Sequence, residues 1–354
     1  MVSGEWQGRR VLVTGHTGFK GSWLALWLKQ LGAEVTGFAL PPPTDTNLFE
    51  RARVGDVLTH IEGDIRDLDA VAAAMRKARP EVIFHLAAQS LVRLSYEQPV
   101  ETYATNVMGT VNVLEAARQS GGVRAFVCIT TDKCYENREW VWPYRETDPM
   151  GGYDPYSSSK GAAELVVSAY RRSYCAEAGI GLASVRAGNV IGGGDWARDR
   201  LIPDLIRAFE RGEAPAIRSP NAVRPWQHVL EALGGYLMIA ERLIAGDPGF
   251  ADAWNFGPGQ EDARPVSWIV ERLAAAWGES ATVPVTWTKS AQHEAGLLRL
   301  DTSRARELLG WRPLLPLGEA LAWIVDWHKT VAGGGDGHAK TVEQISAYRM
   351  RQAA

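Results

Sequence analysis

Tyr156 and Lys160 stand four residues apart in the run Tyr-Ser-Ser-Ser-Lys. On a helix this spacing places both side chains on one face, one turn apart. An ammonium group beside a phenol favours the phenolate and so lowers the tyrosine pKa. Such a tyrosine can take the proton of a substrate hydroxyl while a hydride leaves the same carbon. Ordinary surface helices carry the same spacing by chance, so the pair needs support from its surroundings.

A glycine-rich loop near the start of the chain supplies that support. Gly15–Gly21 has the pattern G-x-x-G-x-x-G, follows the apolar run Arg10–Thr14 and precedes a helical pattern at Ser22–Leu31. Glycines let the backbone approach a pyrophosphate, and the N-terminus of the helix directs free N–H groups at that anion. A plain strand–helix turn is the alternative. The order of elements favours dinucleotide binding by Gly15, Thr17, Gly18, Phe19, Lys20 and Gly21.

The end of the second predicted strand, Glu34–Leu40, does not reveal which dinucleotide is bound. Folds of this kind usually place an acidic residue there for the ribose of NAD, or an arginine nearby for the extra phosphate of NADP. The segment Gly37–Pro41 contains neither. The choice between NAD and NADP therefore stays open at this position.

The elements that must position these motifs alternate between strands and helices, which implies a parallel sheet covered on both faces. We predict an α/β fold, a Rossmann-type doubly wound parallel sheet with a smaller mixed C-terminal substrate lobe. Residues 1–188 would form mainly the dinucleotide domain and 189–332 mainly the lobe, with some chain crossing back. A flexible glycine break would precede a polar tail within 333–354. The predicted strands are Arg10–Thr14, Glu34–Leu40, Val57–Glu62, Val82–Leu86, Ala125–Thr130, Gly181–Arg186 and Trp254–Gly257, and the helices are Ser22–Leu31, Leu68–Ala78, Val100–Gln119, Tyr156–Tyr174, Leu201–Arg211, Val229–Ala245, Val266–Trp277 and Leu317–His328.

Bulk properties narrow the class of protein. The 354 residues are 46% hydrophobic and 22% charged with a net charge of −3, which suggests neither a nucleic-acid partner nor a membrane surface. No apolar run is long enough to span a bilayer, and no signal peptide is apparent. The three cysteines form no CxxC pair and the histidines show no metal-ligand spacing. We expect no bound metal and a cytoplasmic location.

These motifs together resemble the extended short-chain dehydrogenase/reductase family over nearly the whole chain. The resemblance also covers Gly63–Asp67, His85–Gln89, Asn106 and Thr131. It implies NAD as cofactor and Thr131, Tyr156 and Lys160 as catalytic residues. Asp64 could instead cap a helix, and Asn106 could be structural. The further cofactor contacts implied are Asp64, Ile65, Leu86, Ala87, Ala88, Asn106, Thr130, Tyr156 and Lys160.

Four longer segments are similar to one group of that family, the CDP-glucose 4,6-dehydratases. They are residues 131–140, 150–155, 186–196 and 224–229. The resemblance implies conversion of CDP-glucose to CDP-4-keto-6-deoxyglucose and water. The sugar would be oxidised at C4 through bound NAD, would lose water across C5 and C6, and would regain the hydride at C6.

Loss of water requires an acid for the C6 hydroxyl and a base for the C5 proton. Asp132 would be the acid if burial raises its pKa. Many related dehydratases have Asp-Glu at this step, with the glutamate as base, whereas this chain has Asp132-Lys133. A lysine serves as base only if its pKa is depressed. A surface ion pair at a strand end is the alternative interpretation.

Substrate contacts are expected beyond the ends of the strands. Arg224 suits the diphosphate because a guanidinium matches phosphate oxygens, whereas His228 could equally be a helix cap or a core residue. The family resemblance implies a homodimer through the helices Val100–Gln119 and Tyr156–Tyr174. The alternative functions are a nucleotide-sugar 4-epimerase, a 4,6-dehydratase for another nucleotide sugar and, least favoured, a non-catalytic nucleotide-sensing scaffold. The expected substrate contacts are Gln89, Ser90, Thr131, Asn189, Arg224 and His228.

Overall fold

The computed structural model describes residues 5–278, 281, 286–288 and 296–353. Its centre is a seven-stranded sheet in the order β11-β6-β5-β4-β1-β2-β3, in which every neighbouring pair is parallel. The order reverses between β1 and β4, so the sheet is doubly wound and the predicted fold class is confirmed. The strands are β1 (Arg10–Thr14), β2 (Glu34–Ala39), β3 (Thr59–Glu62), β4 (Val82–His85), β5 (Ala125–Ile129), β6 (Gly181–Ala187) and β11 (Ala253–Phe256).

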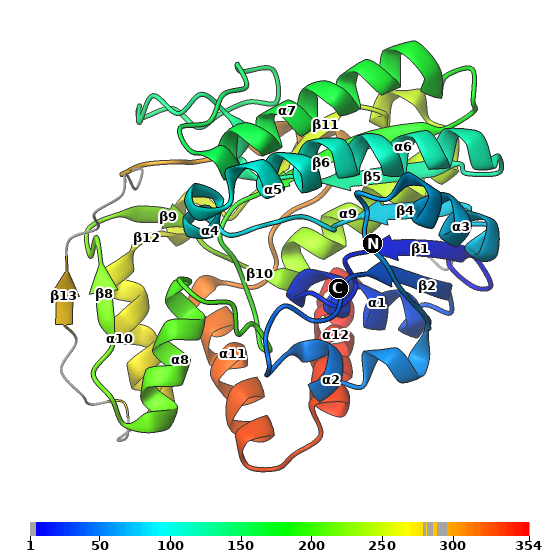
Figure 1. Ribbon diagram of the computed structural model, residues 1–354. Coiled ribbons are helices and arrows are strands. Elements are labelled where there is room, and N and C mark those ends of the chain that lie inside the picture. The colour runs from blue at the N-terminus through cyan, green and yellow to red at the C-terminus, as the bar shows by residue number, and fades with distance from the viewer. Residues whose placement is uncertain (1–4, 279–280, 282–285, 289–295, 354) are drawn as a thin grey trace.

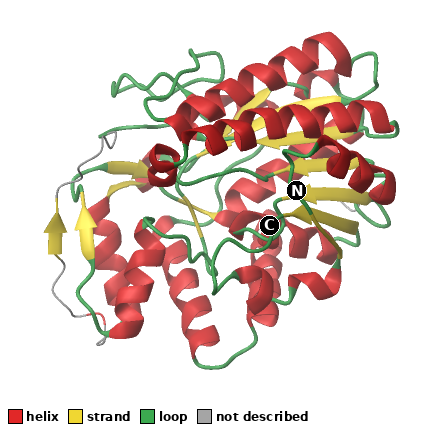
Figure 2. Ribbon diagram, viewed as in Figure 1, coloured by secondary structure: helices red, strands yellow, loops and turns green. Residues whose placement is uncertain are grey.

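Helices cover both faces of this sheet, as Figures 1 and 2 show. The central strands β4 and β5 are fully buried, which matches their continuous apolar sequences. One face packs against α3 (Leu68–Ala78), α6 (Gly109–Ser120) and α7 (Pro155–Tyr170). The other face packs against α1 (Phe19–Gln30) and α9 (Val229–Ile244). No helix among the described residues combines the length and apolar character needed to cross a bilayer.

A smaller lobe lies beside the carboxyl ends of the strands, on the left in Figure 1. Its helices α8 (Leu201–Arg211), α10 (Val266–Trp277) and α11 (Leu317–Ala332) share a separate apolar core. Two-stranded sheets complete it, and the chain returns from it to the main sheet through α9 and β11. The paired strands are β7 (Val190–Ile191) with β10 (Gln227–His228), β8 (Ala216–Arg218) with β13 (Thr286–Thr288), and β9 (Val223–Pro225) with β12 (Ala263–Pro265).

Short helices link these elements. They are α2 (Leu48–Arg51), α4 (Val92–Glu97) and α5 (Pro99–Tyr103). The predicted helix Val100–Gln119 consists of α5, one π-helical turn at Ala104–Met108, and α6. The predicted helix Tyr156–Tyr174 is α7 followed by a π-helical turn at Arg171–Cys175. Single π turns interrupt otherwise continuous helices, so both predictions hold for the path of the chain.

The segment predicted as a polar tail contains a packed helix. Residues Gly337–Ala353 form a helix, α12, and Ile345 and Tyr348 are fully buried. The ring of Tyr348 meets Trp27 of α1 edge to face, and its hydroxyl donates a hydrogen bond to Glu231 of α9. The apolar stripe of α12 is narrow and its sequence is otherwise polar, so composition alone does not predict a packed helix here.

Candidate active site

Two glycines of the loop between β1 and α1 are required by the fold itself. Gly15 has a positive φ of 77°, and a Cβ there would lie 2.6 Å from the backbone nitrogen of Ala87. A Cβ on Gly21 would collide with the carbonyl oxygen of Gly15. The loop therefore turns tightly against the segment after β4, and the two ends of the loop are fixed.

Gly18 behaves differently. Its φ is −82°, and a Cβ there would meet only the carbonyl oxygen of Gly15 at 3.4 Å, an ordinary contact. The protein itself therefore tolerates a side chain at this position, whereas a ligand lying against the backbone would not. Gly18 also begins α1, which has no side-chain cap and no acidic residue in its first turn. Its free N–H groups and positive dipole end suit a pyrophosphate, so the loop fits the dinucleotide expected from the sequence.

Two other loop residues expected at the cofactor are occupied within the protein. Thr17 donates from its hydroxyl to the carbonyl oxygen of Leu40, 2.9 Å away, and so ties the loop to the end of β2. Phe19 packs over Gly192, where a Cβ would lie 2.9 Å from the edge of its ring. Both side chains shape the loop and leave its backbone to face a ligand.

His16 packs against β2 at Gly37, near the strand end where an acid or arginine was sought. The ring of His16 packs on Gly37 so closely that any Cβ would collide with it. His16 Nε2 lies 2.7 Å from His60 Nδ1. Burial and the neighbouring His60 lower the pKa of His16 to about 3, so this ring is neutral. Residue 37 is therefore a glycine because the ring of His16, from the loop after β1, takes the space of a side chain.

Lys20, at the start of α1, belongs to the same crevice as the predicted catalytic residues. Burial, followed by the positive charges of Arg200 and Lys160, lowers its pKa to about 7. Asp132 and Asp195 act on Lys20 in the opposite direction. Charged residues from the end of β5, from α7 and from the smaller lobe therefore all act on the ammonium group of Lys20.

The predicted pair Tyr156 and Lys160 lies on the first turns of α7. Asp154 caps this helix by accepting a hydrogen bond from the backbone nitrogen of Ser157 at 2.9 Å. Tyr156 is 8% exposed and hydrogen-bonds to Thr131, so the end of β5 and the start of α7 meet as expected. Lys160 Nζ donates to the carbonyl oxygen of Ile129 at 3.3 Å.

The sequence predicted that Lys160 lowers the pKa of Tyr156, but in the structure the pKa of Tyr156 is raised. Burial raises the pKa of Tyr156 to about 12, and the hydrogen bond with Thr131 and the charge of Arg200 only partly oppose it. Burial also lowers the pKa of Lys160. Because Lys160 is directed at a main-chain carbonyl beneath the site, its charge does not dominate the tyrosine.

Asp132 and Lys133 occupy a 3₁₀ turn, Asp132–Cys134, directly after the end of β5. Thr131 donates to Asp132 Oδ1 at 2.9 Å and accepts from the backbone nitrogen of Lys133 at 3.3 Å. Asp132 is 2% exposed, and its carboxylate lies over Gly188, where a Cβ would collide with it. The turn is thus held from both sides, and the surface ion pair considered from the sequence is absent between these two residues.

The loop after β4 supplies backbone to the crevice but few free side chains. Leu86–Ala88 are half-buried, and Ala87 lies against the glycine loop. Asn106 lies in the π turn before α6. Its side chain accepts a hydrogen bond from the backbone nitrogen of Gln89 and donates to the backbone carbonyl oxygen of Gln89 and to Ser159 Oγ, all at 2.9 Å. Gln89 bonds in turn to Leu91 and Thr102. Asn106 and Gln89 therefore use their side chains to fix the loop, which favours the structural alternative for Asn106.

Three further residues expected at the cofactor are bound within the protein. Asp64 accepts hydrogen bonds from the backbone and guanidinium of Arg66, and it is Asp67 that caps α3. Ile65 is 4% exposed and packs against Gly109 of α6. Thr130 donates its hydroxyl to Glu164, on the side of β5 away from the turn.

Three residues of the smaller lobe were predicted to contact the substrate, and the structure gives each a different setting. Asn189 has a φ of 37°, a left-handed conformation that asparagine tolerates, between β6 and β7. Arg224 lies in β9 and donates to the carbonyl oxygens of Val223 and Gly296 at 3.3 Å. His228 is fully buried between Trp23 and Trp323 and caps α9. These contacts favour the cap and core alternatives that the sequence left open for His228.

Arg200 and Asp195 are the residues that the sequence did not point to. Arg200 donates to Asp195 Oδ2 at 3.0 Å and to Ser90 Oγ at 3.1 Å, and so joins the lobe to the loop after β4. Its charge reaches both Tyr156 and Lys20. The available signal was an aspartate ending the glycine run Gly192–Gly194 and an arginine just before α8. Among the described residues, no cluster of His, Cys, Asp or Glu has the arrangement of a metal site.

Comparison with known proteins identifies relatives along nearly the full chain. Residues 12–322 match the family model described as GDP-mannose 4,6 dehydratase. A CDP-glucose 4,6-dehydratase of Salmonella typhimurium is 54% identical over 351 residues, which are 97% of each chain. A UDP-glucose 4-epimerase of Thermus thermophilus, solved with NAD, is 26% identical, covers 90% of this chain and 99% of its own, and has a TM-score of 0.76. A dTDP-glucose 4,6-dehydratase of Streptomyces venezuelae, solved with NAD, is 25% identical, covers 92% and 99%, and has a TM-score of 0.75.

These relatives confirm the resemblance inferred from the motifs. The family model extends from the middle of β1 to α11, so it includes the glycine loop, the end of β5, the start of α7 and most of the smaller lobe. The chain belongs to the GDP-mannose 4,6 dehydratase family, within the extended short-chain dehydrogenases/reductases.

Proposed function

We propose that this protein converts CDP-glucose to CDP-4-keto-6-deoxyglucose and water. The observation that carries the proposal is the 54% identity, over 97% of both chains, with an enzyme named CDP-glucose 4,6-dehydratase. The geometry agrees with such a reaction because Tyr156, which serves redox chemistry, and Asp132, which serves elimination, both adjoin Thr131.

The cofactor in this proposal is NAD, which is named in two solved relatives. The backbone of Gly15–Gly21 and the N-terminus of α1 would hold its pyrophosphate. When bound, NAD supplies the acceptor for the C4 hydride and the donor of the C6 hydride. The segment Gly37–Pro41 at the end of β2 offers no acidic side chain for the ribose.

Oxidation requires removal of the C4 hydroxyl proton, which we assign to Tyr156. Burial alone makes its phenolate unfavourable, since the pKa is about 12. The neighbouring Thr131 hydroxyl and the positive charge of Arg200 both lower the pKa of Tyr156 and so favour the phenolate. Tyr156 would therefore depend on Thr131 and Arg200 to take the proton of the substrate hydroxyl.

Elimination follows from the acidity of C5 once C4 is a ketone. Lys133 would take the C5 proton as the neutral amine, and Asp132 would give its proton to the C6 hydroxyl, which leaves as water. Asn189, Ser90 and Arg224 are the proposed contacts to the nucleotide sugar, with Arg224 placed for the diphosphate.

Incubation with CDP-glucose tests the proposal. The product should be lighter than the substrate by one water and should develop a near-ultraviolet band in alkali. A product of unchanged mass with inverted C4 would indicate a 4-epimerase instead, an activity named in one of the relatives. A parallel series with UDP-, dTDP- and GDP-sugars separates the 4,6-dehydratases from one another, and equal rates with another nucleotide would reject the assignment to CDP-glucose.

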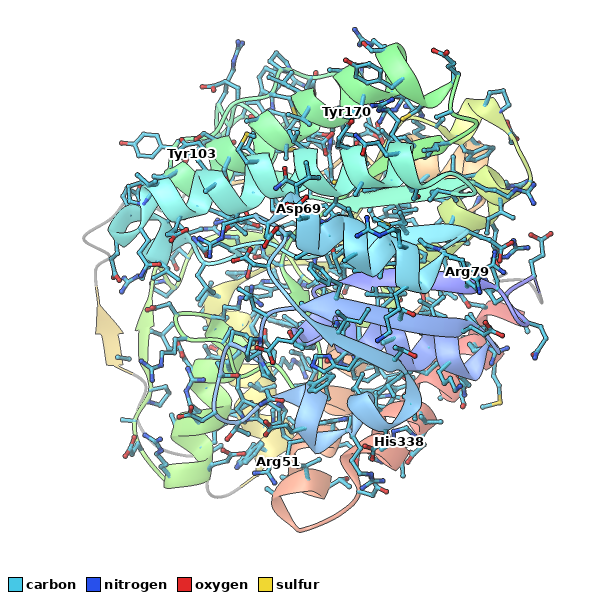
Figure 3. All side chains as sticks on the ribbon, turned by 45° about the vertical axis from the view of Figure 1, so that its right-hand side comes forward. Arg51, Asp69, Arg79, Tyr103, Tyr170 and His338 are labelled. Carbon is cyan, nitrogen blue, oxygen red and sulfur yellow. The ribbon has the colours of Figure 1, made fainter. Side chains whose placement is uncertain are left out.

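We further propose that the protein works as a cytoplasmic homodimer through α5, α6 and α7. Large apolar side chains on these helices and their π turns are exposed, and Figure 3 labels Tyr103 and Tyr170 on the same helices. Pairing of these faces in two copies would bury them. All three cysteines are buried and unpaired, which fits a reducing compartment. Light scattering of Leu165→Glu tests the dimer, since a charge there should yield monomers. The exposed apolar residues are Val100 (80%), Leu165 (62%), Met108 (54%), Tyr174 (47%) and Tyr103 (41%).

A further inference from the structure

A buried ion pair that the proposed mechanism does not use lies beneath the turn Asp132–Cys134. Glu164 follows Lys160 by one turn on α7, and Arg186 lies in β6. Arg186 Nε and Nη2 donate to the two oxygens of Glu164 at 2.9 and 2.8 Å, and both side chains are 4% exposed. Desolvation offsets most of the attraction in such a pair, so its net contribution to stability is small. Its bidentate geometry instead fixes the orientation of both side chains.

The ion pair contacts both flanks of the turn. On one flank, Thr130 donates its hydroxyl to Glu164. On the other flank, Arg186 Nη1 donates to the hydroxyl oxygen of Tyr135 at 2.6 Å. The turn Asp132–Cys134 is therefore flanked on each side by a residue that hydrogen-bonds to the ion pair.

The Tyr135 hydroxyl is held by more than Arg186. It donates to Asn255 Oδ1 in β11 at 2.7 Å, and the amide of Asn255 donates to the main chain at Tyr144 and Asp301. The Tyr135 ring stacks on Tyr144 with centroids 5.2 Å apart. Ring packing would survive loss of the hydroxyl, whereas the connection to the ion pair would not.

The same helix carries the redox residues. Tyr156, Lys160 and Glu164 all project from α7, and all three are buried. A shift of α7 relative to β5 would therefore change the anchors of the turn together with the position of Tyr156. Gly188, at the end of β6, supports Asp132 from the opposite side, because any side chain there would push the carboxylate away.

We propose that Glu164, Arg186 and Tyr135 are positioning residues that hold Asp132 and Lys133 in register with Tyr156, so that elimination follows oxidation of the same bound sugar. This inference rests on the proposed function. None of the three touches the sugar; they act through the turn. Elimination depends on the placement of two short-range proton transfers, and a misplacement of about 1 Å can cost about a hundredfold in rate.

Tyr135→Phe is the variant that tests the inference, with Tyr144→Phe as matched control. Tyr144 stacks on Tyr135, but its hydroxyl bonds to Asn137 and Arg138, away from the ion pair. In a single turnover with CDP-glucose, Tyr135→Phe should form reduced nicotinamide at nearly the normal rate. Its absorbance should then persist, because elimination and return of the hydride are delayed. We expect kcat to fall by about tenfold to a hundredfold, KM to change little, and Tyr144→Phe to match the unaltered enzyme.

Gly188→Ala provides a second test that leaves the ion pair intact. It should displace Asp132 from the other side and give the same persistent absorbance of reduced nicotinamide. Equal slowing of oxidation and elimination in Tyr135→Phe, or kinetics equal to those of Tyr144→Phe, would overturn the positioning role. An unaltered enzyme that forms no 4-keto-6-deoxy product would reject the proposed function itself, and that outcome is visible before any variant is made.

Discussion

The two sides of the crevice differ in how the chain builds them. On the dinucleotide side, one continuous segment, Gly15–Gly21, supplies the turn, the backbone contacts and the helix terminus. On the proposed substrate side, Asn189, Arg200 and Arg224 come from three separate segments, after β6, before α8 and in β9. A local motif can specify the first arrangement, whereas the second depends on the tertiary fold. The predictions below test whether that difference is functional.

The largest effect is expected at the residue where the two sides meet. Tyr156→Phe removes the hydroxyl that we propose takes the C4 proton, and leaves the buried ring in place. Turnover should fall by about a thousandfold, since positioned acid–base groups contribute roughly 10²–10⁴. NAD affinity, measured by titration calorimetry, should change little. Retention of more than a tenth of the activity would remove Tyr156 from the reaction.

A pair of glycine variants tests the dinucleotide side. Gly18→Ala should leave the melting temperature nearly unchanged and weaken NAD binding by about tenfold, because a Cβ there makes only an ordinary contact with the protein but would press on a pyrophosphate. Gly15→Ala should cost about 1–3 kcal/mol of stability, because it strains a positive φ and presses on Ala87. Calorimetric melting and NAD titration of both variants distinguish the two roles. Equal destabilisation by both would show that Gly18 is required by the fold and not by the ligand.

The outcome for the sequence predictions follows the same division. The strand and helix patterns predicted the central sheet and the helices that cover it, because local periodicity indicates buried parallel strands and amphipathic helices. The glycine loop and the pair Tyr156 and Lys160 were found for the same reason. The helices α2, α4 and α12 were not predicted. The structure then placed Thr131 beside Tyr156 and Asp132, as ligand binding beyond the carboxyl ends of strands implies.

The remainder could not be predicted because it depends on contacts between distant segments. Nothing near His228 in sequence indicates that Trp23 and Trp323 enclose it. The side chain of Asn106 is used by Gln89 and Ser159, and the charge of Lys160 is turned toward Ile129. Composition suggested a tail where α12 docks, because the docking surface belongs to α1 and α9.

On the substrate side, Arg224→Gln should act on binding alone. Loss of a hydrogen bond to a charged group costs about 1.5–3 kcal/mol, so KM for CDP-glucose should rise by about tenfold or more while kcat stays within about twofold. Arg118→Gln, which removes an exposed ion pair with Glu115 on α6, is the control and should change neither. Steady-state kinetics at two ionic strengths measure the effect. A fall in kcat with constant KM would place Arg224 at the reacting carbons and not at the diphosphate.

The smallest effect on turnover is expected far from the crevice, where α12 meets the dinucleotide side. Glu231 is 1% exposed and accepts hydrogen bonds from Tyr348 and from the backbone nitrogens of Leu314 and Leu315. Burial raises its pKa from 4.5 to about 7, and these hydrogen bonds, with the charge of Arg351, oppose the rise only in part.

A folded pKa above the unfolded value means that protonation of Glu231 favours the folded state. Its contribution is complete below pH 4.5 and is lost as the pH rises through about 7. Glu231→Gln keeps an acceptor for the two backbone nitrogens and cannot ionise. Its melting temperature relative to the unaltered protein should therefore increase by a few degrees between mildly acidic and mildly alkaline buffers, with turnover nearly constant at each pH. A difference that stays flat with pH would mean that Glu231 keeps one protonation state throughout this range, and would contradict the raised pKa.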